Sequence, residues 1–307
     1  MYIGVDLGGT NIAVGLVTKE GKILSQSSRP TLSERHYSEI VKDIAELCTE
    51  VTQMGGKNIS DIKAIGIGSP GSIDSENGVV VYANNLNWSN LPLAEELRKY
   101  IDVPVKIEND ANAAAYGEYV INGDNKDSFI AITLGTGVGG GIIIDKKIYR
   151  GFNGAGGELG HIAIKYKGEP CSCGNMGCWE AYASVTALIK QTKLAIAENP
   201  DSLMAKDENV SGKTAFVAAK AGDAAGQRVV DQYLEYVAEG ITSIVNIFQP
   251  DVLVIGGGIS REGDYLLNPV KEYVKKHNYA KNLPQTELKI ATLMNDAGII
   301  GAALAAV

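Results

Sequence analysis

The sequence lacks the features that would place the protein in a membrane, on nucleic acid or outside the cell. No apolar run in its 307 residues approaches the length of a membrane span, which is roughly 18 residues. The net charge of −8 is spread along the chain without a basic stripe, so binding to nucleic acid phosphates is not expected. The residues Met1–Asp6 show no basic region or long apolar stretch typical of a secretory signal. We therefore expect a cytoplasmic protein.

Cysteine and histidine are scarce, with four and three residues, yet four of these seven gather in one short region. Cys171, Cys173 and Cys178 fall within eight positions, and His161 stands ten positions before the first of them. Three thiolates and one imidazole form the four-coordinate set that zinc favours. In a reducing compartment clustered cysteines bind metal more often than they form disulfides. The cluster by itself indicates only a metal that pins a loop, while Cys48 lies in a helical pattern and is expected to be buried.

The sequence has neither a P-loop nor a dinucleotide fingerprint, but it has three other glycine loops at predicted strand ends. They are Gly8-Gly9-Thr10, Gly135-Thr136-Gly137 and Gly256-Gly257-Gly258. Such loops expose backbone N–H groups that can hold phosphate oxygens. The first two are predicted hairpin turns, and two of these facing across a cleft would grip one nucleotide. Asp6 is suitably placed to hold magnesium directly or through water, although a carboxylate there can also simply cap a turn.

A shift of 127 positions aligns the opening of the chain with a similar strand, glycine turn and strand from residue 130 onward. This indicates two related α/β lobes with mixed sheets flanked by helices. No linker separates the lobes, and their junction is expected near residues 117–126. Helices are predicted within 40–51 and over 91–100, 179–197, 224–248, 268–277 and 297–306, and another begins at Asn109-Asp110; further strands are predicted over 62–67, 103–107, 252–255 and 288–292.

These motifs carry a family resemblance. The glycine hairpins resemble the phosphate-binding hairpins of the sugar kinase, Hsp70 and actin superfamily. The run from Gly135 to His161, the cysteine cluster, and the runs 6–10, 108–112, 256–258 and 295–303 resemble the ROK family over the full chain. The resemblance is greatest to its bacterial, Gram-positive type glucokinases. It implies a two-lobed actin-like ATPase and sugar kinase fold with ribonuclease H-like repeats, in which residues 1–118 and about 296–307 form a small lobe and residues 119–295 a larger lobe with the zinc loop.

The resemblance also implies a reaction, the transfer of the ATP γ-phosphoryl group to the 6-hydroxyl of glucose. Asp110 would be the general base, and we expect it to cap its helix and to remain ionised because of the helix dipole. The implied sugar residues are Gly71, Asn84 or Asn85, Asn109, Asp110, Glu158, His161 and Glu180. The implied ATP and Mg²⁺ residues are Asp6, Gly8, Gly9, Thr10, Asn11, Gly135, Thr136, Gly137, Gly256, Gly257 and Gly258. His161, Cys171, Cys173 and Cys178 would bind structural Zn²⁺, and the family implies a homodimer.

Three alternatives remain at this point. The acceptor could be another hexose: fructose, mannose, allose or N-acetylmannosamine. A sugar-sensing repressor of the same family is not expected, because it would carry a DNA-binding helix-turn-helix before the first hairpin, which here starts at Tyr2. An ATPase of the Hsp70 or actin kind would need neither the Cys₃His loop nor the Asn109-Asp110 pair.

Overall fold

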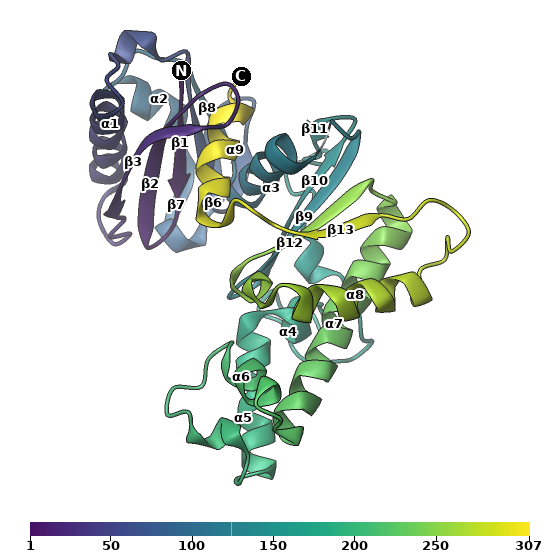
Figure 1. Ribbon diagram of the computed structural model, residues 1–307. Coiled ribbons are helices and arrows are strands. Elements are labelled where there is room, and N and C mark those ends of the chain that lie inside the picture. Colours follow the sequence, from purple (N-terminus) through teal and green to yellow (C-terminus); the bar gives the residue numbers. More distant parts are fainter. Residues whose placement is uncertain (124) are drawn as a thin grey trace. The chain divides into compact units, whose positions relative to one another are not determined.

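The computed structural model describes residues 1–123 and 125–307, which form two compact units (Figure 1). Unit 1 comprises Met1–Ala131, Gly141–Gly157 and Thr292–Val307, and unit 2 comprises Ile132–Gly140 and Glu158–Ala291. The lobe boundaries predicted at residues 118 and 296 remain a prediction, because division into compact units does not show which segments move as one lobe. No helix among the residues described is both long and apolar enough to cross a membrane.

A five-stranded mixed sheet with the order β3-β2-β1-β4-β8 forms the centre of unit 1. Its strands are β1 (Tyr2–Leu7), β2 (Asn11–Val17), β3 (Ile23–Pro30), β4 (Ala64–Ser69) and β8 (Val105–Asn109). The first three pair antiparallel, whereas β4 and β8 join in parallel. Helix α1 (Tyr37–Met54) packs on β2 and β3, and α9 (Ala297–Ala305) packs on β1 and β4.

Alternation along β1 explains why both faces of this sheet are covered. Ile3, Val5 and Leu7 belong to the apolar cluster that includes the buried face of α1. Tyr2 belongs to a second cluster with Ile299 and Ala303 of α9. Because side chains alternate along a strand, Asp6 lies on the α9 face. Asp6 thus lies near the carboxyl end of β1, just before the glycine turn that leads to β2.

The second five-stranded sheet repeats the order of the first, as β11-β10-β9-β12-β13. Its strands are β9 (Ser128–Leu134), β10 (Val138–Ile144), β11 (Lys147–Ile148), β12 (Val252–Gly256) and β13 (Glu287–Ile290). As in the first sheet, an antiparallel pair lies at one end and a parallel pair at the other. The predicted repeat of a strand, glycine turn and strand is present as β1–β2 and β9–β10, and the structure extends it to the order of the whole sheet.

Most predicted helices are present, and one is divided. Helix α7 spans Ala224–Phe248 as predicted, and α3 (Asp110–Asn122) and α8 (Asp264–His277) are close to expectation. The single helix predicted over residues 179–197 is wrong: α4 (Glu180–Ala183) ends at Ser184, which caps α5 (Val185–Glu198). Ser184 has extended backbone angles and its hydroxyl accepts the Ala187 amide at 3.1 Å. A capping serine thus interrupts a helical period that continues on both sides.

Several smaller elements were not predicted. β5 (Ser72–Asp74), β6 (Val79–Ala83) and β7 (Trp88–Leu91) form a three-stranded antiparallel sheet. The helix predicted over 91–100 is shorter, because β7 uses Leu91 and Pro92 caps α2 (Leu93–Arg98). Unit 2 also contains α6 (Thr214–Lys220). Short 3₁₀ helices are η1 (Ile59–Asp61), η2 (Asn84–Leu86), η3 (Leu159–His161), η4 (Leu203–Lys206), η5 (Gly258–Glu262) and η6 (Met294–Asp296).

Candidate active site and metal centre

The predicted phosphate loop of unit 1 is the turn that closes β1 onto β2. The Gly8 amide donates to the Asn11 carbonyl at 2.9 Å. Gly9 lies against Asn85, since a Cβ at position 9 would come within 3.1 Å of the Asn85 Cβ. Thr10 and Asn11 are exposed. The turn therefore presents its tip to solvent with Asn85 beside it, while Asn84 accepts a hydrogen bond from the Tyr82 hydroxyl at 3.1 Å.

Two carboxylates of unit 1, Asp6 and Asp110, both have raised pKa values. Burial raises the pKa of Asp6 to about 6, and the negative charge of Asp110 contributes a smaller part. Burial also raises the pKa of Asp110, although the N–H groups at the start of α3 and the Asn109 side chain oppose this. Loss of water on burial outweighs these hydrogen bonds, so the pKa of Asp110 lies above its usual value even at the start of a helix, and its ionisation stays a prediction. Such a raised pKa is typical of a group that accepts protons.

Asn109, rather than Asp110, caps helix α3. Its side-chain oxygen accepts the amides of Ala111 at 3.0 Å and Asn112 at 3.2 Å. Its amide nitrogen donates to the Gly71 carbonyl at 3.1 Å. Gly71 has a φ of 94° and a Cβ there would lie 2.0 Å from the Tyr82 carbonyl, so only glycine fits. Unit 1 thus brings together three predicted sugar residues, Gly71, Asn109 and Asp110.

A buried carboxylate that we did not assign from the sequence supports this turn. Glu108 is 4% exposed and accepts the Asn109 amide at 3.0 Å and the Asn112 side chain at 3.2 Å. Its other oxygen accepts the Arg150 Nε at 2.8 Å. The sequence signal for Glu108 was an acidic residue at the end of an apolar strand. Its partner Arg150 lies 42 positions away, so the sequence does not indicate the pair. Glu108 and Arg150 also line a cavity of about 1210 Å³ on unit 1, which contains none of the predicted sugar residues.

In unit 2 the second and third glycine loops lie beside each other. The Gly135 amide donates to the Gly137 carbonyl at 3.0 Å, and the Thr136 carbonyl accepts the Thr186 hydroxyl at 2.8 Å. Gly257 follows β12, and a Cβ at this position would lie 2.3 Å from the carbonyl of Leu134, the residue before Gly135. The backbone that follows β12 therefore packs directly against the end of β9, beside the second glycine loop.

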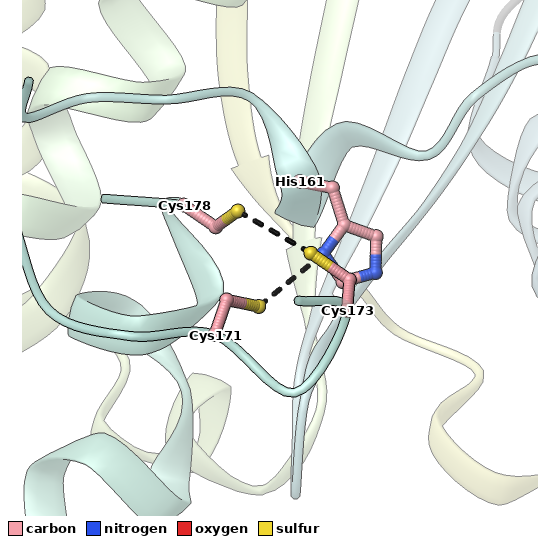
Figure 2. Close-up of side chains that lie close together, drawn as sticks. All are labelled: His161, Cys171, Cys173 and Cys178. Atoms are coloured by element: carbon pink, nitrogen blue, oxygen red, sulfur yellow. Dashed lines mark hydrogen bonds between the residues drawn. The ribbon is translucent and has the colours of Figure 1, made fainter. Parts of the chain in front are cut away.

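The predicted metal ligands converge on one point of unit 2 (Figure 2). One ligand atom from each of His161, Cys171, Cys173 and Cys178 lies within 4.8 Å of all the others. The His161 Nδ1 is 3.6 Å from the Cys171 sulfur, and the sulfurs of Cys173 and Cys178 are 3.7 Å apart. All four cysteines of the chain are free thiols.

These separations fit a tetrahedral zinc ion. Zn–S bonds of about 2.3 Å place two sulfur ligands about 3.8 Å apart, close to the observed pair, whereas a disulfide needs about 2.05 Å. Burial raises the pKa of the Cys178 thiol to about 12, and a bound cation would offset this by stabilising the thiolate. The donor set therefore suits zinc, and with Nδ1 facing the sulfurs, Nε2 of His161 faces away from the other ligands.

Glu180 connects the cysteine loop to the second phosphate loop. Its Oε2 accepts the Val138 amide at 2.9 Å, next to Gly137. Its Oε1 accepts the Ser172 hydroxyl at 3.4 Å and lies 3.9 Å from the Cys171 sulfur. A Cβ at position 137 would lie 2.3 Å from Oε2, so this contact requires glycine there. One carboxylate thus spans two predicted sites of unit 2.

Glu158 precedes a single turn of 3₁₀ helix, η3, and His161 is the last residue of that turn. The His161 amide donates to the Glu158 carbonyl at 3.1 Å, and Glu158 is exposed. The predicted set is therefore divided between the units: Asp6, the first glycine loop, Gly71, Asn84, Asn109 and Asp110 lie in unit 1, whereas Glu158, Glu180, the metal ligands and the other glycine loops lie in unit 2.

Comparison with known proteins extends the likeness over the whole chain. The sequence model of the ROK family matches residues 2–307. A glucokinase of Thermotoga maritima is 39% identical, with 98% of this chain and 95% of the relative covered. A glucokinase of Halalkalibacterium halodurans is also 39% identical, with 98% and 93% covered.

Solved structures give the same result. A ROK family glucokinase from Streptomyces griseus, in complex with glucose and AMPPNP, is 35% identical with a TM-score of 0.81 over 98% of this chain and 97% of that one. A ROK hexokinase from Thermus thermophilus is 33% identical with a TM-score of 0.83 over 99% and 97%. The predicted actin-like sugar kinase fold of mixed sheets flanked by helices is confirmed.

Proposed function

Because this chain belongs to the ROK family, we propose that it is an ATP-dependent glucokinase that phosphorylates the 6-hydroxyl of glucose. The observation that carries the proposal is the 39% identity to glucokinases over nearly the full length of both chains. Phosphoryl transfer depends mainly on alignment and on neutralisation of charge. The glycine loops can donate N–H groups to phosphate oxygens, while Asp6 and Asp110 supply carboxylates for a cation and for the hydroxyl proton.

In unit 1, Asp110 acts as the general base. It takes the proton of the sugar hydroxyl while that oxygen bonds to the γ-phosphorus and the bond to the departing ADP oxygen breaks. Asn109 and Glu108 fix the turn that carries Asp110, and Gly71 lies at the rim with Asn84 or Asn85. Asp6 would hold Mg²⁺, and this ion would supply positive charge to neutralise the phosphates. A pKa of about 6 leaves Asp6 ionised at neutral pH, as a cation ligand must be.

In unit 2, Glu158, His161 and Glu180 bind the sugar, and the backbone of Gly135–Gly137 and Gly256–Gly258 binds the nucleotide. The orientation of His161 supports its double role, because Nδ1 faces the cysteine sulfurs and Nε2 remains for a sugar hydroxyl. A zinc ion held by His161, Cys171, Cys173 and Cys178 would have four protein ligands and therefore no open position for Lewis-acid chemistry. It would fix the ring of His161 and the loop beside Glu180.

The test is ADP release measured with Mg·ATP and a panel of sugars. The proposal predicts turnover that requires sugar and is fastest with glucose. Fastest turnover with fructose, mannose, allose or N-acetylmannosamine would identify a different hexose kinase of the same family. Turnover that needs no sugar would indicate an ATPase and overturn the proposal. We also propose a homodimer, which light scattering of the purified protein tests.

A further inference from the structure

Thr31 makes two hydrogen bonds to the first phosphate loop. It lies between β3 and α1, is fully buried, and has no role in the predicted site. Its hydroxyl donates to the Gly8 carbonyl at 2.6 Å, and its amide donates to the Thr10 carbonyl at 2.9 Å. One residue therefore engages the carbonyls on both sides of Gly9.

Because peptide groups are planar, these two hydrogen bonds also fix the direction of the loop N–H groups that would bind phosphate oxygens. In a trans peptide the C=O of one residue and the N–H of the next point in opposite directions. With the Gly8 carbonyl directed at Thr31, the Gly9 N–H must point away from it. The same holds for the Thr10 carbonyl and the Asn11 N–H. Thr31 thus fixes the direction of two N–H groups in the loop that is proposed to hold phosphate oxygens.

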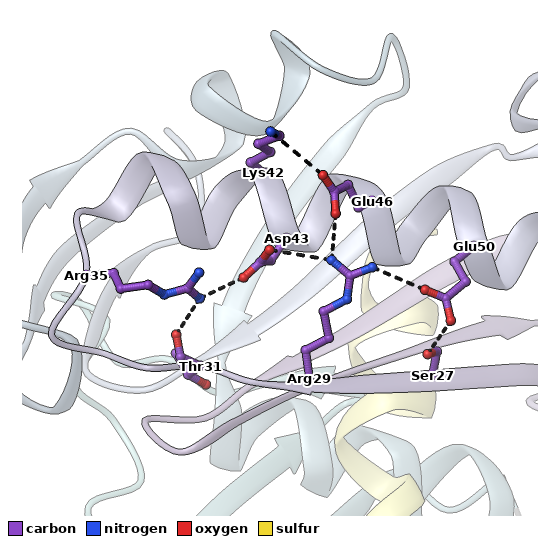
Figure 3. Close-up of polar contacts among 8 residues, drawn as sticks. All are labelled: Ser27, Arg29, Thr31, Arg35, Lys42, Asp43, Glu46 and Glu50. Atoms are coloured by element: carbon purple, nitrogen blue, oxygen red, sulfur yellow. Dashed lines mark hydrogen bonds and ion pairs between the residues drawn. The ribbon is translucent and has the colours of Figure 1, made fainter.

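An ionic network holds Thr31 in turn (Figure 3). Arg35 donates to the Thr31 carbonyl at 2.8 Å and to Asp43 of α1 at 2.7 Å. Leu32, the residue after Thr31, has a φ of 48°, which is unfavourable for a bulky side chain. Arg35 stabilises this turn through the Leu32 carbonyl as well, since its backbone amide donates to it at 3.0 Å. Strained backbone held by its surroundings is common beside functional sites.

Arg29 belongs to the same network but does not contact Thr31. It pairs with Asp43, Glu46 and Glu50 along one face of α1. Arg29 therefore anchors α1 to β3 without a bond to Thr31 or the phosphate loop. A comparison of Arg35 and Arg29 variants can thus distinguish a local effect on phosphate binding from a general effect of the ionic network.

In unit 2 a threonine hydroxyl likewise donates to a carbonyl of a glycine loop. There the hydroxyl of Thr186 donates to the Thr136 carbonyl in the second glycine loop at 2.8 Å. A threonine hydroxyl on a carbonyl of each loop is consistent with a shared need to orient the N–H groups that follow.

We propose that Thr31 is a positioning residue for the nucleotide phosphates, acting through the carbonyls of Gly8 and Thr10, with Arg35 holding it in place. The inference rests on the proposed kinase function. It predicts a specific effect on ATP, since Thr31 touches the phosphate loop and none of the predicted sugar residues.

The experiment compares Thr31→Val, which keeps the shape but removes the hydroxyl, with Thr31→Ser, which restores it. Thr52→Val is the matched control, because Thr52 is also buried in unit 1 and its hydroxyl donates to a backbone carbonyl, that of Cys48, at 2.7 Å. Thr31→Val should raise the KM for ATP about five- to tenfold, the effect of roughly one lost hydrogen bond, with the KM for glucose unchanged. Thr31→Ser and Thr52→Val should keep the wild-type KM for ATP.

Arg35→Gln and Arg29→Gln provide a second pair that does not alter a buried residue. Arg35→Gln should raise the KM for ATP about two- to threefold, and Arg29→Gln should leave it unchanged. Calorimetric binding of Mg·ATP separates this inference from the proposed function. A wild-type protein that binds Mg·ATP but phosphorylates no sugar refutes the glucokinase proposal alone. Thr31→Val that binds Mg·ATP as tightly as wild type, whatever its melting temperature, refutes the role of Thr31.

Discussion

Substituting Asp6 with asparagine should make the protein more stable and less active. The pKa of Asp6 is raised from 3.8 to about 6 in the folded state, chiefly by burial and secondly by Asp110. The folded state therefore binds this proton more tightly than the unfolded state, and stability decreases as pH rises through that range. A rise of about two pKa units corresponds to about 3 kcal/mol at 1.36 kcal/mol per unit. Asparagine does not ionise and avoids this cost.

Urea unfolding of Asp6→Asn and wild type at pH 4.5 and pH 8 measures the effect. We expect the variant to be more stable by up to about 3 kcal/mol at pH 8, with a smaller difference at pH 4.5. Asp223→Asn is the opposite control, because the amides of Gly226 and Leu203 lower the pKa of Asp223, so its removal should destabilise the protein at pH 8. An Asp6→Asn variant that is less stable than wild type at pH 8, or a difference independent of pH, would refute the reasoning. Loss of sugar-dependent ADP release in the stabilised variant would mark Asp6 as retained for function.

Two further predictions concern unit 2. Cys173→Ser should lower the zinc content below one ion per chain, measured by elemental analysis, and should raise the KM for glucose about tenfold. Cys48→Ser should keep the zinc. Normal glucose kinetics in the zinc-free variant would exclude a role of the metal in the site. Gly137→Ala should displace the flexible Glu180 carboxylate and lower the free energy of unfolding by about 1 kcal/mol, through loss of its hydrogen bond from the Val138 amide. Gly135→Ala, with open space around its Cβ, should lower it far less, and equal effects in urea unfolding would contradict the contact.

The sequence predicted most accurately those elements whose signal is local or repeated. Helix α7 has both its ends as expected, since an apolar period runs up to Phe248 and Pro250 follows shortly after. The 127-residue repeat indicated two related lobes, and the two five-stranded sheets share the same strand order. The cysteine cluster was also predictable, because three of its ligands lie within eight positions and zinc requires the fourth nearby.

Contacts between distant residues were beyond this reasoning. Nothing around Glu108 identifies Arg150 as its partner, and nothing around Thr31 indicates that its hydroxyl reaches Gly8. Asp110 was misjudged as the helix cap because Asn109 and Asp110 are both good capping residues, and only the structure shows that Asn109 accepts the amides. The pKa of Asp110 depends on burial, which a sequence motif does not report.

The central claim is that Asp110 removes the proton from the glucose hydroxyl, and Asp110→Asn tests it most directly. The variant keeps the size of the side chain and cannot act as a base. Steady-state ADP release with glucose should fall by about 10²- to 10⁴-fold in kcat, with the KM for glucose nearly unchanged. Near-normal kcat in Asp110→Asn would contradict the account.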